Sequence, residues 1–356
     1  MEKKLKIGVV ACGGILDWAH FPAYLKMDNV ELVAFCDIDV KKAEKYAKKY
    51  YEAKKTDKMP AVFENYMDLI NMEGIEAVDI CTPNYLHSIV AVAAFERGLH
   101  VFCEKPDAVS VAEATRMKEA SEKAGKVLMV MRNNRYGLAQ ELKTRIENGE
   151  LGEIYATRCG WQRRRGGPPH GSWFCNKKES GGGPLIDLGV HMIDVTMWLM
   201  GNPTPVSVSG CTYNKFGPDG SGEGIVKDGK EYLHDTEDFA MAFIKFDNGA
   251  CMQVEVSWAS NVVEESIFFE LRGTKGGAIK TDGIYMVSNG DDDKQDFNLK
   301  DSVPDRVGGH EGNLRHFVDV VLNGAEPMFV PEQGLNMVKI LEAIYKSAET
   351  GEEVML

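Results

Sequence analysis

The run KIGVVACGGIL, residues 6–16, decides the fold. Its first half is a short apolar stretch typical of a buried strand, and its second half holds two adjacent glycines before a helical pattern begins. A strand, a glycine turn and a helix in this order form a site where a dinucleotide pyrophosphate sits at a helix N-terminus. The match to G-x-G-x-x-G is incomplete, because Ala11 replaces the first glycine and Leu16 the third. Taken alone, the run is equally compatible with an ordinary strand–helix connection.

Support for nucleotide binding comes from the next apolar run, Val30–Cys36, which ends at Asp37. An acid at the end of the second strand accepts hydrogen bonds from the adenosine ribose and repels a 2′-phosphate. Lys41 and Lys42 weaken the case against NADP, although exposed helix lysines are common. The two features together predict NAD as the cofactor. The contacts expected from them are Cys12, Gly13, Gly14, Ile15 and Asp37.

The first third of the chain alternates strand and helix signals. Short apolar runs suit strands buried on both faces of a parallel sheet, and the segments between them have helical spacing. The strands are expected at 5–11, 30–36, 77–81, 100–104 and 127–131, with helices at 40–51, 86–97 and 111–124. We therefore predict an α/β fold whose N-terminal domain, residues 1–131, is a Rossmann doubly wound parallel sheet.

The remaining residues, 132–356, show a different pattern. Helical stretches at 136–148 and 185–199 are followed by long strand-like runs at 236–246 and 250–259, with Asp247-Asn248-Gly249 between them. An Asn-Gly between two such runs indicates a hairpin whose turn residues both need positive φ. Further strands are expected at 266–272 and 278–280, and two helices after Glu311. This predicts a C-terminal α/β domain with a large, mostly antiparallel sheet and helices on one face.

Composition narrows the class of protein. The formal net charge of −13 argues against a nucleic-acid partner. No apolar run approaches the roughly 20 residues that span a bilayer, so no membrane association is expected. The eight cysteines include no Cys-x-x-Cys pair, and several fall in apolar runs, which favours reduced, buried thiols in a cytoplasmic protein.

Two further strand ends carry polar residues. The loop 81–87 should face the cofactor, because ligands of open α/β sheets bind outside the carboxyl ends of the strands. A turn in which Thr82 or Asn84 caps a helix is an equally good interpretation. The following strand ends in Glu104-Lys105-Pro106, where a lysine could hydrogen-bond a reacting oxygen. The expected cofactor contacts here are Thr82, Pro83, Asn84, His87, Glu104 and Lys105.

The second domain contributes the run SGGGPLIDLGVHMID, residues 180–194. Asp187 and His191 are four residues apart and Asp194 is three further on, so the three share one helical face. A histidine there is suited to take a proton from a hydroxyl, although a satisfied core histidine remains possible. The three glycines would allow close approach of a substrate or cofactor. No third ligand at metal spacing is evident, so no metal site is predicted.

The segment Trp161–Phe174 is rich in arginine and tryptophan. Aromatic rings stack on sugar faces and arginines donate to hydroxyls or anions, so Arg163, Arg164 and Trp173 are candidate substrate contacts. A basic surface loop is an equally good interpretation. The glycine-rich loop Gly217–Gly229 could cover a pocket or simply move freely.

These motifs, in this order, resemble the Gfo/Idh/MocA oxidoreductases, the glucose–fructose oxidoreductase and inositol dehydrogenase family. The resemblance covers essentially the whole chain and implies a Rossmann domain followed by an α/β domain whose open sheet forms a homo-oligomer (dimer, tetramer or larger). It implies that Lys105 contacts the reacting oxygen, that Asp187 and His191 hold substrate and transfer the proton, and that Asp194 lies near the substrate or supports the helix. It also places residues 132–136, with Asn133, at an inter-domain crossover where cofactor and substrate meet.

The expected activity is hydride exchange between NAD and a secondary hydroxyl carbon of a sugar, cyclitol or glycoside, possibly forming a keto-glycoside. One alternative is glycoside cleavage through transient oxidation, with NAD recycled in the site. Another is a dinucleotide sensor without turnover, although a sensor does not need the set Lys105, Asp187 and His191.

Overall fold

The computed structural model describes residues 3–217, 226–227, 230–231, 233–281, 284–288, 297–299 and 307–356. Most of the loop 217–229, considered above as a pocket cover, lies outside them. The chain forms two compact units: Met1–Asn133 with Gly308–Leu335, and Asn134–Val307 with Asn336–Leu356. None of the described helices combines the length and hydropathy that a membrane span requires.

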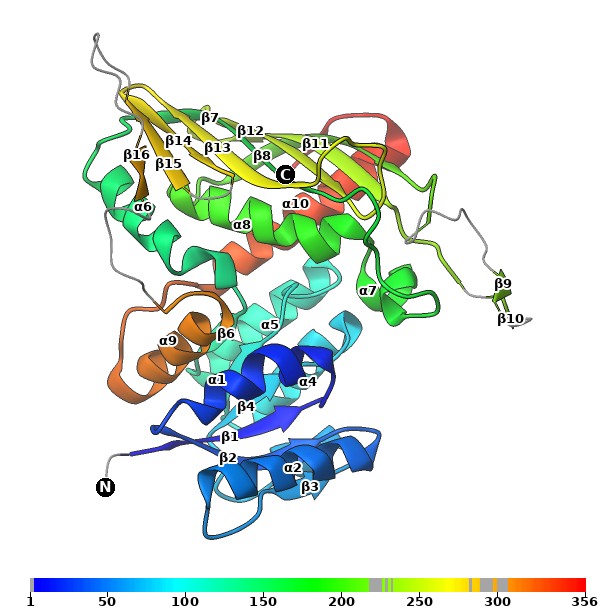
Figure 1. The fold of residues 1–356 in the computed structure, drawn as a ribbon, viewed down its shortest axis with the longest axis vertical. Coiled ribbons are helices and arrows are strands. Elements are labelled where there is room, and N and C mark those ends of the chain that lie inside the picture. The colour runs from blue at the N-terminus through cyan, green and yellow to red at the C-terminus, as the bar shows by residue number, and fades with distance from the viewer. Residues whose placement is uncertain are drawn as a thin grey trace. The chain divides into compact units, whose positions relative to one another are not determined.

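The first unit is built on a six-stranded parallel sheet in the order β3-β2-β1-β4-β5-β6 (Figure 1). This is the Rossmann order, in which the two halves of the sheet diverge between β1 and β4. The predicted parallel sheet is confirmed; the short edge strand β3 was not predicted. The strands are β1 (Leu5–Val10), β2 (Val30–Cys36), β3 (Ala61–Phe63), β4 (Ala77–Ile80), β5 (His100–Cys103) and β6 (Leu128–Val130).

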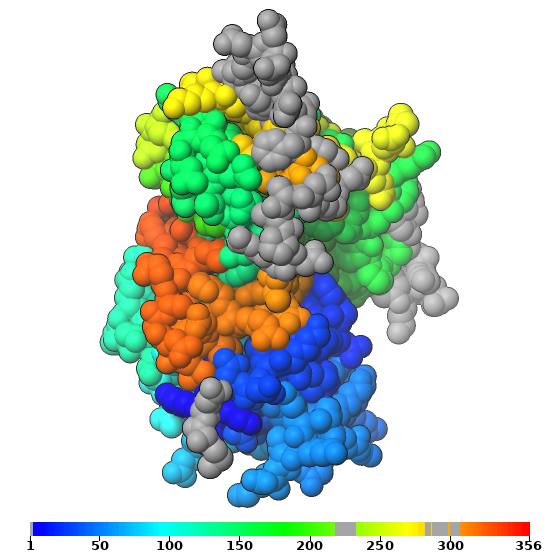
Figure 2. Space-filling view, turned by 60° about the vertical axis from the view of Figure 1, so that its left-hand side comes forward, coloured from blue at the N-terminus to red at the C-terminus, as the bar shows by residue number. Residues whose placement is uncertain are grey.

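The helices of this unit follow its strands, and one returns from the far end of the sequence. They are α1 (Phe21–Leu25), α2 (Val40–Lys54), α3 (Tyr66–Ile70), α4 (His87–Glu96), α5 (Val111–Ala124) and α9 (Gly309–Asn323). Leu314, Phe317 and Val318 of α9 are buried in the same apolar core as β1 and β2. Figure 2 shows this orange segment against the blue N-terminal residues. The first unit therefore includes Gly308–Leu335, which the predicted boundary at residue 131 places in the second domain.

The second unit is built on a nine-stranded sheet in the order β16-β15-β14-β13-β7-β12-β11-β8-β17. Only the pair β7 and β12 is parallel among the described pairs of this sheet, so the predicted mostly antiparallel sheet is confirmed. A separate ribbon joins β9 (Val226–Lys227) and β10 (Lys230–Glu231). The sheet strands are β7 (Ile154–Gln162), β8 (Pro205–Tyr213), β11 (Phe239–Phe246), β12 (Cys251–Ser257), β13 (Ser266–Gly273), β14 (Gly276–Lys280), β15 (Ile284–Ser288), β16 (Phe297–Asn298) and β17 (Val354–Met355).

The hairpin between β11 and β12 is present, but its turn differs from the prediction. Gly249 has a φ of 82°, whereas Asn248 is not among the residues with positive φ. The Gly249 N–H donates to the Phe246 carbonyl at 3.0 Å, which closes a turn followed by a left-handed glycine. The loop is thus a turn with a glycine bulge rather than the two-residue form with both residues left-handed.

Helices cover one face of this sheet (Figure 1). The helices of this unit are α6 (Leu138–Glu147), α7 (Lys177–Ser180), α8 (Val190–Leu199) and α10 (Pro331–Thr350); residues 336–350 of α10 belong to it. A π-helical turn over Leu185–Gly189 runs directly into α8. A second π-helical turn, Leu16–His20, leads into α1 in the first unit. Such turns are rare in proteins, and those that occur are often found at functional sites.

Candidate active site

The glycine turn has free space around its two glycines and is hydrogen-bonded to Asp37. Ala11, in the place of the first glycine, has a φ of 76°, a left-handed conformation that explains why glycine is usual there. The N–H of Cys12 donates to Asp37 Oδ2 at 2.7 Å, so the turn and the acid, 25 residues apart, are brought together. A β-carbon on Gly13 or Gly14 would meet no atom within 4 Å.

The carboxyl ends of β1 and β4 both border this turn's side of the sheet, where Rossmann domains bind dinucleotides. Thr82 follows β4, and its buried hydroxyl has no hydrogen-bond partner in the described part of the chain. An open glycine turn at a helix start, an acid after β2 and a buried unsatisfied hydroxyl after β4 all fit NAD. NAD would therefore be held by the turn, Asp37 and the loop after β4.

His87 is placed differently from the other residues of that loop. Its side chain is fully buried, with Nδ1 2.7 Å from the Pro106 carbonyl and Nε2 3.0 Å from the Thr82 carbonyl. Burial lowers the pKa of His87, although the two carbonyls act in the opposite direction. His87 therefore braces the loop after β4 against the loop after β5. Asn84, three residues earlier, begins a 3-10 turn and is also buried.

Lys105 lies between buried neighbours after β5. From Val101 to Ala108 it is the one residue that is partly exposed, so its side chain has access that Glu104 and Asp107 do not. Its N–H donates to Glu104 Oε2 at 3.1 Å, and its peptide bond to Pro106 is cis.

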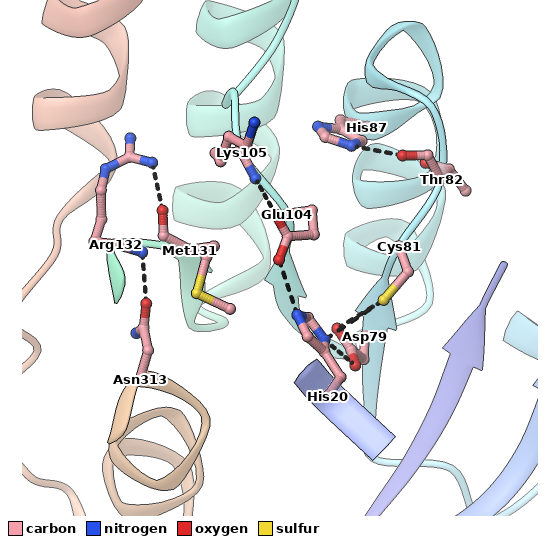
Figure 3. Close-up of polar contacts among 10 residues, drawn as sticks. All are labelled: His20, Asp79, Cys81, Thr82, His87, Glu104, Lys105, Met131, Arg132 and Asn313. Atoms are coloured by element: carbon pink, nitrogen blue, oxygen red, sulfur yellow. Dashed lines mark hydrogen bonds and ion pairs between the residues drawn. The ribbon is translucent and has the colours of Figure 1, made fainter. Parts of the chain in front are cut away.

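Beneath Lys105 lies a buried cluster of His20, Asp79, Cys81 and Glu104, which we call the His20 cluster (Figure 3). His20 Nδ1 is 2.8 Å from Asp79 Oδ2, and His20 Nε2 is 2.8 Å from Glu104 Oε1. Burial alone would raise the pKa of Glu104, but the hydrogen bond and charge of His20 lower it to about 2. For His20 the directions are reversed. Burial alone would lower its pKa, but the charge and hydrogen bond of Asp79 raise it well above its ordinary value. Sequence reasoning missed His20 and Asp79.

At the end of this unit, Arg132 is fixed by residues distant in sequence. Its Nη2 donates to Asp107 at 2.5 Å, and its N–H donates to the Asn313 side chain of α9 at 2.5 Å. The guanidinium also lies 4.8 Å from the centre of the Phe329 ring. The neighbouring Asn133 has a buried Oδ1 with no hydrogen-bond partner in the described structure, which leaves an acceptor for a ligand.

In the second unit, Asp187 and His191 are the two accessible residues of an otherwise buried stretch. Every other residue from Gly182 to Leu199 is buried, whereas these two, one helical turn apart, are partly exposed. Asp187 Oδ2 accepts a hydrogen bond from Trp258 Nε1 at 3.0 Å, and the His191 ring lies 6.1 Å from that of Trp161. The helix thus presents a fixed carboxylate and an imidazole on one side.

Asp194 shares that helical face in sequence but is committed to an ion pair. Arg135 donates to its two oxygens, Nε to Oδ2 at 2.8 Å and Nη2 to Oδ1 at 2.6 Å, and both residues are buried. Of the two roles considered for Asp194, this geometry favours support of the helix.

Two of the three glycines before this helix, Gly182 and Gly183, lie close to other parts of the same unit. A β-carbon on Gly182 would lie 1.8 Å from the Tyr345 hydroxyl, and one on Gly183 would lie 2.0 Å from the Glu237 carbonyl oxygen. The Glu237 carboxylate accepts hydrogen bonds from the N–H groups of Gly183 and Leu185 and from Tyr345. Within this unit the glycines therefore allow close approach of the protein itself, and Glu237 caps the helix that carries Asp187 and His191.

The arginine-rich segment is partly anchored. Arg163 lies over the Trp161 ring at 5.0 Å and donates to the Gly166 carbonyl at 2.6 Å. Arg164 is exposed, and Trp173 is half-buried with its ring stacked 3.8 Å from Phe174. Trp161 is thus flanked by Arg163 and His191, an arrangement that brings this segment to the accessible side of the helix.

Comparison with known proteins identifies both parts of the chain. Residues 5–132 match the Gfo/Idh/MocA oxidoreductase family's NAD-binding Rossmann fold, and residues 143–356 match its C-terminal alpha/beta domain. The chain is 33% identical over 355 residues to the D-glucoside 3-dehydrogenase of Escherichia coli (strain K12), covering 99% of this chain and 97% of that protein.

Two further similarities extend the picture. The levoglucosan dehydrogenase of Pseudarthrobacter phenanthrenivorans is 32% identical over 288 residues, covering 78% of this chain and 73% of that protein. A solved levoglucosan dehydrogenase, in complex with NADH and L-sorbose, has a TM-score of 0.83 at 23% identity over 99% of both chains, which shows a common fold. This chain therefore belongs to the Gfo/Idh/MocA family of oxidoreductases, with an NAD-binding Rossmann domain followed by the family's C-terminal α/β domain.

Proposed function

We propose that this protein oxidises one secondary hydroxyl of an intact glycoside or related sugar with NAD, forming the corresponding keto-sugar. The observation that carries the proposal is the selective access of Lys105, Asp187 and His191 within segments that are otherwise buried. The full-length similarity to a D-glucoside 3-dehydrogenase favours glycosides within the wider class of sugars and cyclitols.

Each residue has a chemical role in this proposal. When bound, NAD would supply the hydride acceptor for the carbinol carbon. His191 takes the hydroxyl proton, since an imidazole is suited to proton transfer near neutral pH. Lys105 donates a hydrogen bond to the same oxygen and stabilises its developing negative charge. Asp187, held by Trp258, orients the substrate beside His191.

The proposal also includes contacts outside the reacting group. Arg163, Arg164 and Trp173 would bind the rest of the sugar, while Asn133 and the loop 82–84 would contact NAD. We also propose a homo-oligomer, in which another copy of the chain covers the outer face of the sheet. On β11 that face carries apolar side chains: buried Ala240, Ala242 and Ile244 alternate with Phe239, Met241 and Phe243, which therefore lie on the opposite face. The eight free cysteines support a reducing, cytoplasmic location.

The test is a screen of purified protein with NAD against methyl α- and β-glucosides, free glucose and inositol, following NADH absorbance and product mass. We expect NADH to accumulate with one group of compounds and a product lighter by two hydrogen atoms. Glycoside cleavage without free NADH would identify a recycling enzyme instead. NAD binding without any turnover across the panel would support a sensor.

A further inference from the structure

His20 joins the helix after the glycine turn to the loop of Lys105. It is the last residue of the π-helical turn Leu16–His20, and its side chain is fully buried. Its two ring nitrogens face carboxylates from two neighbouring strands, Asp79 on β4 and Glu104 just after β5. The π-helical turn Leu185–Gly189 of the second unit carries Asp187, so the two turns share a local geometry that is common at functional sites.

The partners of His20 determine its charge. An ionised carboxylate only accepts hydrogen bonds, and a neutral imidazole has one N–H to donate, so with both carboxylates ionised an imidazolium is needed to satisfy both contacts at 2.8 Å. The remaining titratable groups around it are Cys81 at 3.5 Å from Nδ1, Tyr24 of α1, His310 of α9 and Lys105. Burial and the charges of His20 and Lys105 lower the pKa of His310 to about 4, which leaves that ring neutral beside the imidazolium.

The contact continues from Glu104 to Lys105. Glu104 uses Oε1 for His20 and Oε2 for the Lys105 N–H, so one carboxylate connects the imidazolium to the backbone of the lysine (Figure 3). Without the positive charge of His20, two carboxylates would share a buried site, and one of them would take up a proton. Protonation of Glu104 would disturb the group that fixes the Lys105 peptide.

We propose that His20 is a positioning residue: it stays protonated at working pH and, through Glu104, fixes Lys105 relative to the helix that follows the glycine turn. The inference rests on the proposed role of Lys105 in catalysis. It adds a physical link, within the first unit, between the segment that would hold the NAD pyrophosphate and the loop that carries the reacting lysine.

A metal ion in the same cluster is the competing interpretation. One ligand atom each from His20, Asp79 and Cys81 lies within 4.8 Å of the others, and all three residues are buried. However, His20 Nδ1 and Asp79 Oδ2 are 2.8 Å apart, whereas two ligand atoms on a tetrahedral Zn²⁺ are separated by about 3.3 Å. The spacing therefore favours a shared proton.

The first arm of the test measures the charge of His20 directly. ¹⁵N-histidine NMR on the full chain, without substrate, should show one of the eight histidines still doubly protonated at a pH well above the ordinary histidine pKa. That signal should disappear in His20→Gln. A neutral His20, or zinc retained in stoichiometric amount by the purified protein, would overturn the proposal even if His20→Gln fails to fold.

The second arm measures positioning in the enzyme with saturating NAD. His20→Gln should lower kcat about tenfold or more with a smaller change in KM. His100→Gln is the matched control, because His100 lies at the opposite end of β5 and accepts a hydrogen bond from the Val127 N–H. The double variant His20→Gln/Asp79→Asn restores the charge balance and should recover most of the lost kcat.

The outcomes separate the two proposals. Wild-type kcat in His20→Gln, or no recovery in the double variant, would refute positioning by charge. Failure of the wild-type protein to oxidise any sugar would refute the proposed function, whereas the NMR result would still decide the state of His20.

Discussion

The buried ion pair between Arg135 and Asp194 permits a quantitative prediction. Both side chains are almost completely buried and form two parallel hydrogen bonds at 2.6 and 2.8 Å. Asp194→Asn keeps the shape of the side chain but leaves the guanidinium charge buried without its counter-ion. Breaking such a pair costs about 3–5 kcal/mol. For a unit of this size that corresponds to a fall in Tm of roughly 6–20 °C.

Tryptophan fluorescence during thermal unfolding is the appropriate assay. Four of the five tryptophans belong to the second unit, namely Trp161, Trp173, Trp198 and Trp258, and Trp198 lies 5.9 Å from the Arg135 guanidinium. The signal therefore follows mainly the unit in which the pair lies. Arg135→Met/Asp194→Val removes both charges and should recover most of the lost stability, because apolar replacement of a buried pair is often neutral.

The matched control is Glu147→Gln on α6, which removes a solvent-exposed carboxylate from its pair with Lys143 at 3.5 Å. Its expected cost is below about 1 kcal/mol. If Asp194→Asn were no more destabilising than Glu147→Gln, the structural role of the pair would be refuted. A raised KM well below the unfolding temperature would instead show that Asp194 contacts substrate.

Three other results are expected. Lys105→Met and His191→Ala should each abolish most turnover while NAD affinity, measured by titration calorimetry, stays within about threefold; lost NAD affinity with retained turnover would contradict the assigned roles. Asp37→Ser should weaken NAD relative to NADP, and an unchanged ratio of kcat/KM values would remove Asp37 from the ribose site. The pKa values of His100 and His310 are lowered from 6.5 to about 4 in the folded protein, so the stability they contribute is present above pH 6.5 and is lost as the pH falls through 4. His310→Gln should therefore flatten the acid-side fall of Tm, and an identical pH profile would show that His310 is not held neutral.

Much of the fold was predictable because its signals are local. Buried parallel strands are continuous apolar runs, and β1, β2, β4, β5 and β6 were all found in this way. The edge strand β3 has three partly exposed residues and gives no such run. The return of α9 to the first unit also has no local signal, because the apolar face of a helix does not specify which core it joins.

The candidate site was predictable to the extent that its residues lie in short motifs. Asp37, Lys105, Asp187 and His191 were proposed as site residues because they lie at strand ends or on one helical face. The glycines 181–183 were predicted to allow close approach of a substrate or cofactor. The sequence cannot reveal that Glu237 and Tyr345 approach Gly182 and Gly183.

His20 illustrates the same limit. Its partners are 59 and 84 residues away, and a lone histidine in an amphipathic segment carries no sign of either carboxylate. The one feature of the sequence that pointed to such a cluster is Asp79, an aspartate within an apolar strand. A buried carboxylate requires a partner, so its presence there indicated a polar group nearby.

The central claim is hydride transfer from a ring carbon of an intact glycoside to NAD. The most direct measurement is a single turnover of methyl glucoside deuterated at its ring carbons, with mass analysis of the nucleotide and the sugar. We expect reduced nucleotide carrying one deuterium, together with a keto-glycoside that retains its methyl group. Reduced nucleotide without deuterium would contradict hydride transfer from a ring carbon. So would nucleotide and glycoside that both remain unchanged.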